Sequence, residues 1–144
     1  MGLDIYFYKA KRSKLKLQDN NVEYINSNTF IAAHNLDTDI FNEVAYFRKV
    51  NFLLPFFSYI DNCSYREVKR DELERLSVNC TNVLEKRNDE TSMTLLPTQS
   101  GFFFGNQDYN ECYYQDVEDV RNCIIDLLDN WNEHKDAIFL YCWW

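Results

Sequence analysis

The sequence predicts an α+β fold of one domain, residues 1–144, with about three helices packed on one face of a small, mainly antiparallel sheet. Two observations support this prediction. The chain begins and ends with strand-like segments: side chains alternate between an apolar and a more polar face along Leu3–Tyr8, and Ala137–Trp144 is almost wholly apolar. Between them, apolar residues recur with the period of a helix. We therefore expect the N- and C-terminal strands to pair.

After the first strand, the chain is expected to form a hairpin and then a helix. Val22–Ile25 and Thr29–Ala33 are rich in β-prone residues and flank an Asn-Ser-Asn turn. Asp37 then begins a predicted helix that continues to about Leu54, where Pro55 ends or kinks it. One amide lies in its apolar stripe, and a buried amide must find hydrogen-bond partners. The stripe consists of Ile40, Val44, Phe47, Asn51 and Leu54.

Two further helices are predicted after a short strand at Tyr65–Val68. Asp71, with a glutamate three positions later, resembles a capping box and begins a helix that ends near Arg87. The polar stretch Asn88–Ser92 is assigned to a loop. The last helix follows a similar cap at Asp108, and its core residues alternate between spacings of four and three. These core residues are Tyr113, Val117, Val120, Ile124, Leu127 and Trp131.

Composition favours a packed protein without a membrane span. Hydrophobic residues make up 46% of the chain and aromatic residues 17%, which is enough for a core and argues against disorder. No apolar run approaches the roughly 20 residues that cross a bilayer, and no secretory signal is visible. The cysteines are odd in number and lack a Cys-x-x-Cys pair, so we expect reduced thiols and a cytoplasmic location. They are Cys63, Cys80, Cys112, Cys123 and Cys142.

The net charge of −8 is unevenly distributed along the chain. Five basic residues lie between Lys9 and Lys16, whereas nine acids and two basic residues give the segment from Asp108 to Asp136 a charge of −7. This acidic segment favours a partner with a basic surface and argues against direct nucleic-acid binding. The alternative is that it only keeps the protein soluble. The expected acidic contact residues on the last helix are Asp116, Glu118, Asp119, Asp126 and Asp129.

The sequence contains no motif that identifies an enzyme. It has no P-loop, no dinucleotide fingerprint and no metal-protease helix. Nucleophilic catalysis needs a base beside the nucleophile, and the two histidines, His34 and His134, lie outside any recognisable motif. We therefore expect a binding protein with no cofactor, no metal and no catalytic residue.

The segment Leu95–Gly105 is the most informative part of the chain. It holds two of the three glycines, and glycine is needed where the backbone takes a positive φ or is closely approached. The segment fits either a binding loop or a structural elbow, in which case Arg48 and Asn51 only tie it down. A binding site would join polar residues of the first predicted helix to the loop. Its members would be Glu43, Arg48, Asn51, Thr98, Gln99, Ser100, Gly101, Phe103, Gly105 and Tyr109.

Three segments carry a family resemblance: Met1–Asp4, Glu43–Lys49, and Leu96–Gly105 followed by Tyr109. In this order they resemble a group of small uncharacterised proteins of phages, prophages and gut bacteria. Members of the group tend to have Trp in place of Phe47. The resemblance implies no catalytic residue. It implies an accessory protein of a mobile element that works inside a bacterial cell.

These observations lead to two functional predictions. The first is a non-enzymatic interaction protein that binds a host or phage protein. A specific form of it is an inhibitor of a host defence protein, similar to an anti-CRISPR protein, that acts through the acidic helix. The second is a small-molecule or nucleotide binder that uses Arg48, Asn51 and the Pro97–Gly105 loop.

Overall fold

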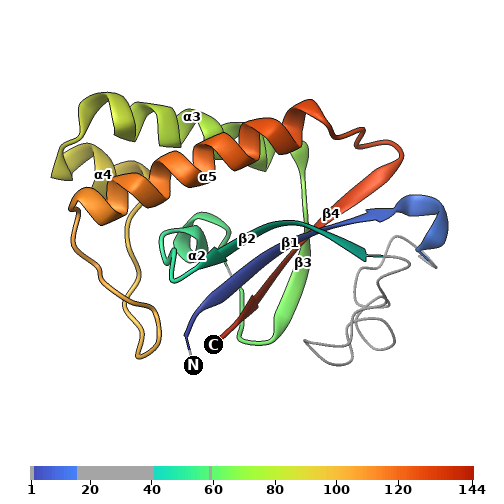
Figure 1. Ribbon diagram of the computed structural model, residues 1–144, viewed down its shortest axis with the longest axis horizontal. Coiled ribbons are helices and arrows are strands. Elements are labelled where there is room, and N and C mark those ends of the chain that lie inside the picture. The colour runs from blue at the N-terminus through green and yellow to red at the C-terminus, as the bar shows by residue number, and fades with distance from the viewer. Residues whose placement is uncertain (1, 16–40, 59) are drawn as a thin grey trace.

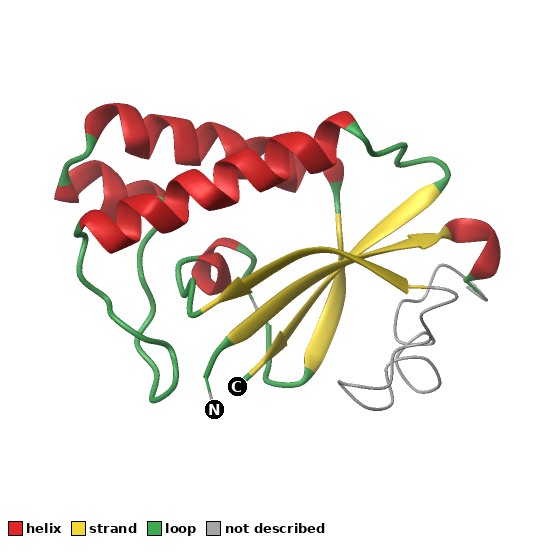
Figure 2. Cartoon of the chain, in the orientation of Figure 1, coloured by secondary structure: helices red, strands yellow, loops and turns green. Residues whose placement is uncertain are grey.

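The fold is an antiparallel sheet with helices on one face, as the sequence predicts (Figures 1 and 2). The computed structural model describes residues 2–15, 41–58 and 60–144. Four strands lie in the order β2-β1-β4-β3, and each neighbouring pair is antiparallel. The strands are β1 (Asp4–Lys11), β2 (Phe41–Arg48), β3 (Ser64–Val68) and β4 (Asp136–Trp143). The N- and C-terminal strands pair in the centre of the sheet, so that prediction is confirmed.

Three helices lie together on one side of the sheet in Figure 1. They are α3 (Arg70–Lys86), α4 (Asp89–Leu95) and α5 (Glu111–Asp129), and two short helical turns, η1 (Arg12–Lys14) and α2 (Leu53–Phe56), complete the fold. No helix in the described part of the chain is both long enough and apolar enough to span a bilayer. All five cysteines are free.

The main core lies between the sheet and the helices. Ile5 and Phe7 of β1 contribute to it from the sheet. The six core positions predicted for the last helix, from Tyr113 to Trp131, are all buried, which confirms its period. Burying one large aliphatic or aromatic side chain contributes about 1.5–3 kcal/mol, so burial of this stripe stabilises the packing of α5 in the core.

The opposite face of the sheet carries a second, smaller cluster. Its buried members include Tyr8 of β1 and Phe139 and Tyr141 of β4. Because β4 is central and buried on both faces, its sequence is a continuous apolar run without the alternation of a half-exposed strand. The same reasoning predicted a central strand there.

The predicted helix from Asp37 to Leu54 is wrong over residues 41–48, which form β2, and of its described residues only Leu53 and Leu54 are helical, at the start of α2. The pairing of β1 with β2 shifts register between Phe7 and Tyr8, which pair with Ala45 and Glu43. Val44 is therefore an extra residue on β2, and a bulge of this kind breaks the two-residue alternation that identifies a strand. Residues 37–40 and the predicted hairpin at 22–33 lie outside the described residues.

Asn88–Ser92, predicted as a loop, is in fact the start of a helix. The side chain of Asn88 accepts a hydrogen bond from the backbone N–H of Thr91 at 2.8 Å, which makes Asn88 the N-cap of α4.

The two predicted caps are displaced by two residues from the observed ones. The N-cap of α3 is Lys69, whose N–H donates to the carboxylate of Glu72 at 3.0 Å, where Asp71 was expected. The N-cap of α5 is Asn110 in place of Asp108. Lys69 is not a residue type favoured at an N-cap, whereas Asp108 and Asn110 both are, so residue type and spacing identified neither cap.

Candidate functional site

Asn51 holds the loop of residues 97–109, hereafter loop 97–109, in one conformation. Its Nδ2 donates to the carbonyl oxygens of Phe104 and Asn106, both at 3.0 Å. Its Oδ1 accepts from the N–H of Gln99 at 3.1 Å. The side chain is only 3% exposed, and every donor on the amide has a partner. The buried amide that the sequence predicted to meet something polar therefore meets the loop backbone.

In loop 97–109 one phenylalanine, Phe104, is buried and another, Phe102, is exposed, and the glycines allow this arrangement. A Cβ on Gly101 would lie 2.6 Å from the Phe104 ring, so only glycine lets this ring fold back over the loop. Phe104 is buried and packs edge-on against Trp144, with ring centroids 5.2 Å apart. Phe102 is 93% exposed. Gly105 has a φ of +83°, which closes the turn.

Further hydrogen bonds attach the loop to the rest of the protein. The N–H of Leu3 donates to the carbonyl of Phe103 at 3.0 Å, and the N–H of Thr98 donates to the hydroxyl of Tyr109 at 3.2 Å. The loop is thus a structural elbow, and it also presents one aromatic side chain to solvent. The sequence had selected Phe103 for the site, whereas Phe103 is partly buried and Phe102 is the exposed ring.

Loop 97–109, the end of β2 and the first half of α5 enclose a pocket of about 140 Å³, hereafter the loop pocket. A cavity of about 150 Å³ holds one benzene molecule, so the loop pocket suits a ligand of that size. Its lining contains residues of the predicted loop site and of the predicted acidic contact face, together with residues that the sequence did not indicate. The lining residues are Arg48, Lys49, Asn51, Phe52, Thr98, Gly105, Asn106, Asp108, Asn110, Cys112, Tyr113 and Asp116.

Most polar groups in the loop pocket already have partners. Nη1 of Arg48 lies 3.4 Å from Oδ1 of Asp4, and the hydroxyl of Tyr46 donates to the same oxygen at 2.6 Å. The side-chain oxygens of Asn106 and Asn110 accept from backbone N–H groups at 2.7 and 3.2 Å. These contacts fix the walls of the pocket.

Asp116 is the exception in the loop pocket. Among the described residues, none forms an ion pair or a hydrogen bond with its carboxylate. Burial, and secondly the charge of Asp119, raise the pKa of Asp116 to about 6. A carboxyl group with a raised pKa in a pocket is a common property of functional sites.

The other predicted site residues lie outside the loop pocket. Ser100 and Gly101 are at the loop tip, and Glu43 is on β2 opposite Tyr8. Asp119 accepts from Gln115 at 2.9 Å, on the outer surface of α5. Four of the five predicted acids do not line the pocket. They are Glu118, Asp119, Asp126 and Asp129.

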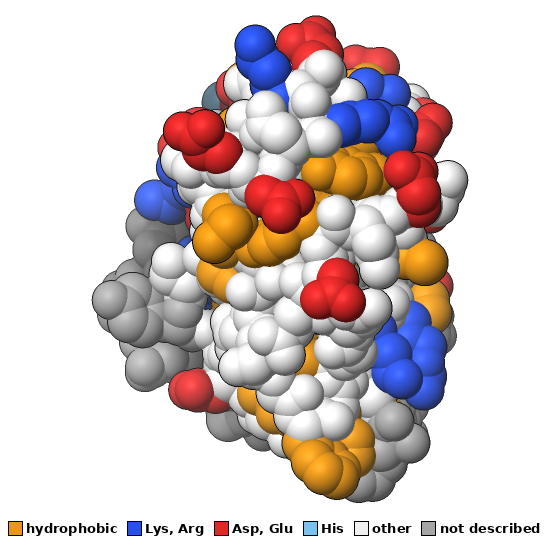
Figure 3. All heavy atoms as spheres, turned by 90° about the vertical axis from the view of Figure 1, so that its left-hand side faces the viewer, with side chains coloured by type: hydrophobic (Ala, Val, Ile, Leu, Met, Phe, Trp, Pro, Cys, Tyr) orange, Lys and Arg blue, Asp and Glu red, His pale blue; other side chains and the backbone are white. Residues whose placement is uncertain are grey.

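The predicted acidic contact residues also do not form one continuous face. At about 100° per residue, Asp119 and Asp126 lie within about 80° of Asp116, whereas Glu118 is about 160° away. Figure 3 looks onto the end of the molecule that carries loop 97–109. Acidic side chains are spread over this end, and hydrophobic side chains gather at its lower edge, at the height of the loop tip in Figure 1.

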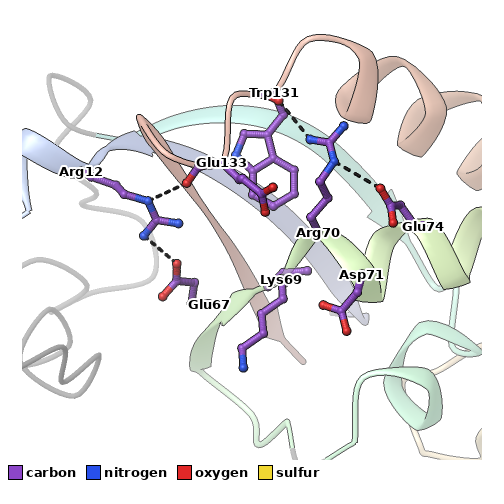
Figure 4. Close-up of a pocket in the computed structure, with 9 residues that line it drawn as sticks. Arg12, Glu67, Lys69, Arg70, Asp71, Glu74, Trp131 and Glu133 are labelled. Atoms are coloured by element: carbon purple, nitrogen blue, oxygen red, sulfur yellow. Dashed lines mark hydrogen bonds and ion pairs between the residues drawn. The ribbon is translucent and has the colours of Figure 1, made fainter.

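A second, larger pocket of about 490 Å³ lies between η1, the start of α3 and the chain that follows α5 (Figure 4). Arg12 donates to the carbonyl of Glu133 at 2.8 Å and to the carboxylate of Glu67 at 2.9 Å. Arg70 donates to the carbonyls of Leu128 and Trp131 at 3.0 and 3.1 Å. Both arginines therefore connect elements of the fold.

Sequence reasoning missed this second pocket. The hydrogen bond from Arg12 to Glu133 joins residues 121 positions apart, and those of Arg70 span about 60 positions, so no local motif reports them. Its lining contains nearly equal numbers of acids and bases: Arg12, Glu67, Val68, Lys69, Arg70, Asp71, Glu74, Trp131 and Glu133. This mixed charge does not select a class of ligand.

The groups that could act as nucleophiles or metal ligands are dispersed. Burial raises the pKa of the Cys80 and Cys142 thiols to about 12, so both are protonated at neutral pH. Cys63, Cys112 and His134 are exposed. Within residues 2–15, 41–58 and 60–144, no group of three or more His, Cys, Asp or Glu side chains is placed to hold a metal ion.

Comparison of the chain with protein-family models, with curated proteins and with solved structures gave no match. The loop pocket and the exposed Phe102 are therefore interpreted from their own chemistry.

Proposed function

We propose that this protein is a non-enzymatic interaction protein that binds a partner protein through loop 97–109, with Phe102 as the anchor. The observation that carries the proposal is the 93% exposure of a phenylalanine ring on a loop that the fold holds in place. Burying such a ring in a partner's pocket contributes about 1.5–3 kcal/mol. Aromatic side chains are enriched at the centres of protein interfaces.

The rigidity of the loop supports this role. A flexible loop loses conformational entropy when it binds, and a loop that is already ordered loses little. The hydrogen bonds of Asn51 and Leu3 order the backbone on both sides of Phe102 before any partner arrives. The protein therefore presents its anchor in one orientation.

The partner is proposed to have a basic surface around the pocket that receives Phe102. The net charge of −8 and the row of Asp116, Asp119 and Asp126 on one flank of α5 support a basic partner, since complementary charge speeds association and excludes like-charged surfaces. A nucleic-acid-binding groove of a host defence protein has this character. Inhibition of such a protein, by an accessory protein of a phage or prophage, is the specific form of the proposal.

The test uses Phe102→Ala with Met93→Ala as the matched control, because Met93 is also exposed, at 59%, but lies on α4. A protein captured by the wild-type chain from a bacterial lysate is purified, and its Kd for each variant is measured by calorimetry. We expect Phe102→Ala to weaken binding by about 30-fold, which corresponds to about 2 kcal/mol, and Met93→Ala to leave it unchanged. Equal Kd values for the wild type and Phe102→Ala would contradict the proposal.

A charge-reversal experiment tests the basic surface separately. Replacing Asp119 and Asp126, the two exposed acids of the row on α5, with Lys should slow association with the same partner and weaken its dependence on salt concentration. If the association rate and its salt dependence stay the same, the partner is not recognised through these acids.

The loop pocket favours a second candidate function, the binding of a small molecule by Arg48, Asp116 and their neighbours. Its volume of about 140 Å³ is below the roughly 300 Å³ of common ligand pockets, so a small ligand suits it better than a nucleotide. Screening of metabolites by thermal shift tests this candidate, because a ligand at about 100 times its Kd adds about 2.7 kcal/mol of stability. A library without any hit, or hits whose stabilisation is unchanged in both Arg48→Ala and Asp116→Asn, would exclude it.

A further inference from the structure

We propose that the loop pocket binds a small cationic group, an ammonium or a guanidinium, whose charge pairs with the carboxylate of Asp116. The inference rests on the loop pocket being a binding site, which is the second candidate function, and it does not depend on Phe102. The charges that the fold leaves without a counterion indicate the chemical class of the ligand.

The carboxylate of Asp116 has no counterion among the described residues. The side chain is partly buried on the second turn of α5, and no described residue supplies a cation or a hydrogen-bond donor to it. Burying an unpaired carboxylate is unfavourable. Its pKa is raised to about 6 by burial and by Asp119, and neither cause is a cation. A positively charged ligand would compensate this carboxylate.

One of the two cations in the pocket lining, Arg48, is directed to a carboxylate outside the lining. Arg48 is paired with Asp4, which also accepts from Tyr46. The aliphatic stem of Lys49 lies against Gly105, where a Cβ would be 3.2 Å from the lysine Cβ. With the Arg48–Asp4 pair counted as neutral, the lining keeps one cation, Lys49, against the two carboxylates of Asp108 and Asp116. The remaining charges of the lining therefore sum to −1.

The lining of the loop pocket also supplies further hydrogen-bond acceptors. An ammonium or guanidinium donates several hydrogen bonds and accepts none. The hydroxyl of Thr98 and the amide oxygens of Asn106 and Asn110 line the same pocket as Asp116. Each of these oxygens has two lone pairs, and each amide oxygen accepts one N–H from the protein. The pocket therefore offers two charged and several neutral acceptors in a volume that suits a group of the size of methylguanidinium.

Such a group could come from a free small amine or from the Lys or Arg side chain of a protein. Both sources share the chemistry, and a comparison of probes separates them. Methylguanidinium and ethylammonium represent the free cation, and a capped Gly-Arg-Gly peptide represents the side chain. A Kd for the peptide at least about tenfold lower than that of methylguanidinium identifies a protein source, and equal values identify a small molecule.

The experiment is an NMR titration of the full chain with these probes, up to about 50 mM so that a Kd in the millimolar range is measurable. We expect saturable shifts in the backbone amides of loop 97–109 and the first turns of α5. Asp116→Asn should raise the Kd by at least tenfold, and Glu85→Gln, which changes an exposed acid on α3, should leave it unchanged. The neutral analogue methylurea should not bind.

A second readout does not depend on any variant. A bound cation favours the ionised carboxylate, so the pKa of Asp116, followed by its ¹³C carboxyl shift, should fall when methylguanidinium is added. The other charged or titratable groups around this carboxylate are Arg48, Lys49, Asp108, Cys112, Tyr113 and Asp119. Acetate serves as the anionic probe.

The outcomes separate the inference from the function on which it rests. Saturable binding of acetate without binding of the cations would overturn the inference and leave the pocket as an anion site built on Arg48. Binding of methylurea as tight as that of methylguanidinium, or cation binding that survives Asp116→Asn, would also overturn it. Absence of binding by every probe would overturn the inference and the small-ligand function together.

Discussion

Asn51 and Asp116 line the same pocket, yet their side chains differ in burial and in hydrogen bonding. The amide of Asn51 is almost fully buried and has a partner for each donor, whereas the carboxylate of Asp116 is partly buried and has none among the described residues. A buried polar group with all its partners stabilises a structure, and one without partners destabilises it. The comparison separates a residue whose hydrogen bonds stabilise the fold from a residue that the fold leaves without a partner.

The largest expected effect that tests this comparison is that of Asn51→Ala. The change removes three hydrogen bonds and leaves the carbonyls of Phe104 and Asn106 and the N–H of Gln99 without the amide. We expect the free energy of unfolding to fall by about 3 kcal/mol. Urea denaturation measures it, with Asn122→Ala, an exposed asparagine on α5, as the control. A loss below about 0.5 kcal/mol would show that the amide does not hold the loop.

The next effect in size is that of Gly101→Ala. The added Cβ would lie 2.6 Å from the Phe104 ring, so the ring or the loop must move. We expect a loss of about 2 kcal/mol, as for other overpacked sites, together with a change in the fluorescence of Trp144, which contacts Phe104. Wild-type stability and unchanged fluorescence would mean that the ring has free space.

A smaller effect of opposite sign is expected for Asp116→Asn, which should stabilise the free protein above pH 6. Because burial raises the folded pKa to about 6 from an ordinary 3.8, the folded state binds the proton more tightly than the unfolded state. The wild type therefore loses stability as pH rises from about 4 to about 6, and the Asn variant does not. We expect a gain of about 1 kcal/mol at pH 7.5, reduced by solvent screening, and none below pH 4.

Thermal or urea denaturation from pH 3.5 to 8 tests this prediction. Asp126→Asn controls for the loss of an exposed acid on the same helix. If Asp116→Asn is less stable than the wild type at pH 7.5, Asp116 is, like Asn51, a residue that the fold requires.

The smallest expected effect on stability is that of Phe102→Ala. The ring is 93% exposed and contributes almost no burial, so the free energy of unfolding should change by less than about 0.5 kcal/mol. Phe104→Ala, which removes a buried ring, should cost about 3–5 kcal/mol. Equal losses for the two variants in urea denaturation would mean that Phe102 packs on the protein in solution.

The elements with regular patterns were predictable from the sequence, and those with an irregularity were not. The period of α5 and the alternation along β1 identified both elements, and the apolar run of β4 indicated a central strand. The extra residue in β2 at Val44 disturbed the alternation, and the remaining apolar residues happened to fit a helix.

The site was predictable only in part for the same physical reason. The sequence indicated that Arg48, Asn51 and loop 97–109 belong together, because a buried amide needs partners and glycines mark a tight turn. It placed Asp116 on an outer acidic face, since the helical period cannot show that a distant loop closes over that flank of α5. It also gave no means of telling the exposed Phe102 from the neighbouring rings.

The central position of the β1–β4 pair has a consequence for the order of folding. This pair joins residues 4 and 143, so the middle of the sheet forms only after residues 136–143 have been synthesised. Until then β1 has β2 as its partner, and β3 has no neighbour in the sheet. Contacts between residues so far apart in sequence slow folding, because the entropy of closing a long loop is lost before the contact forms. β4 is therefore the strand that completes the sheet.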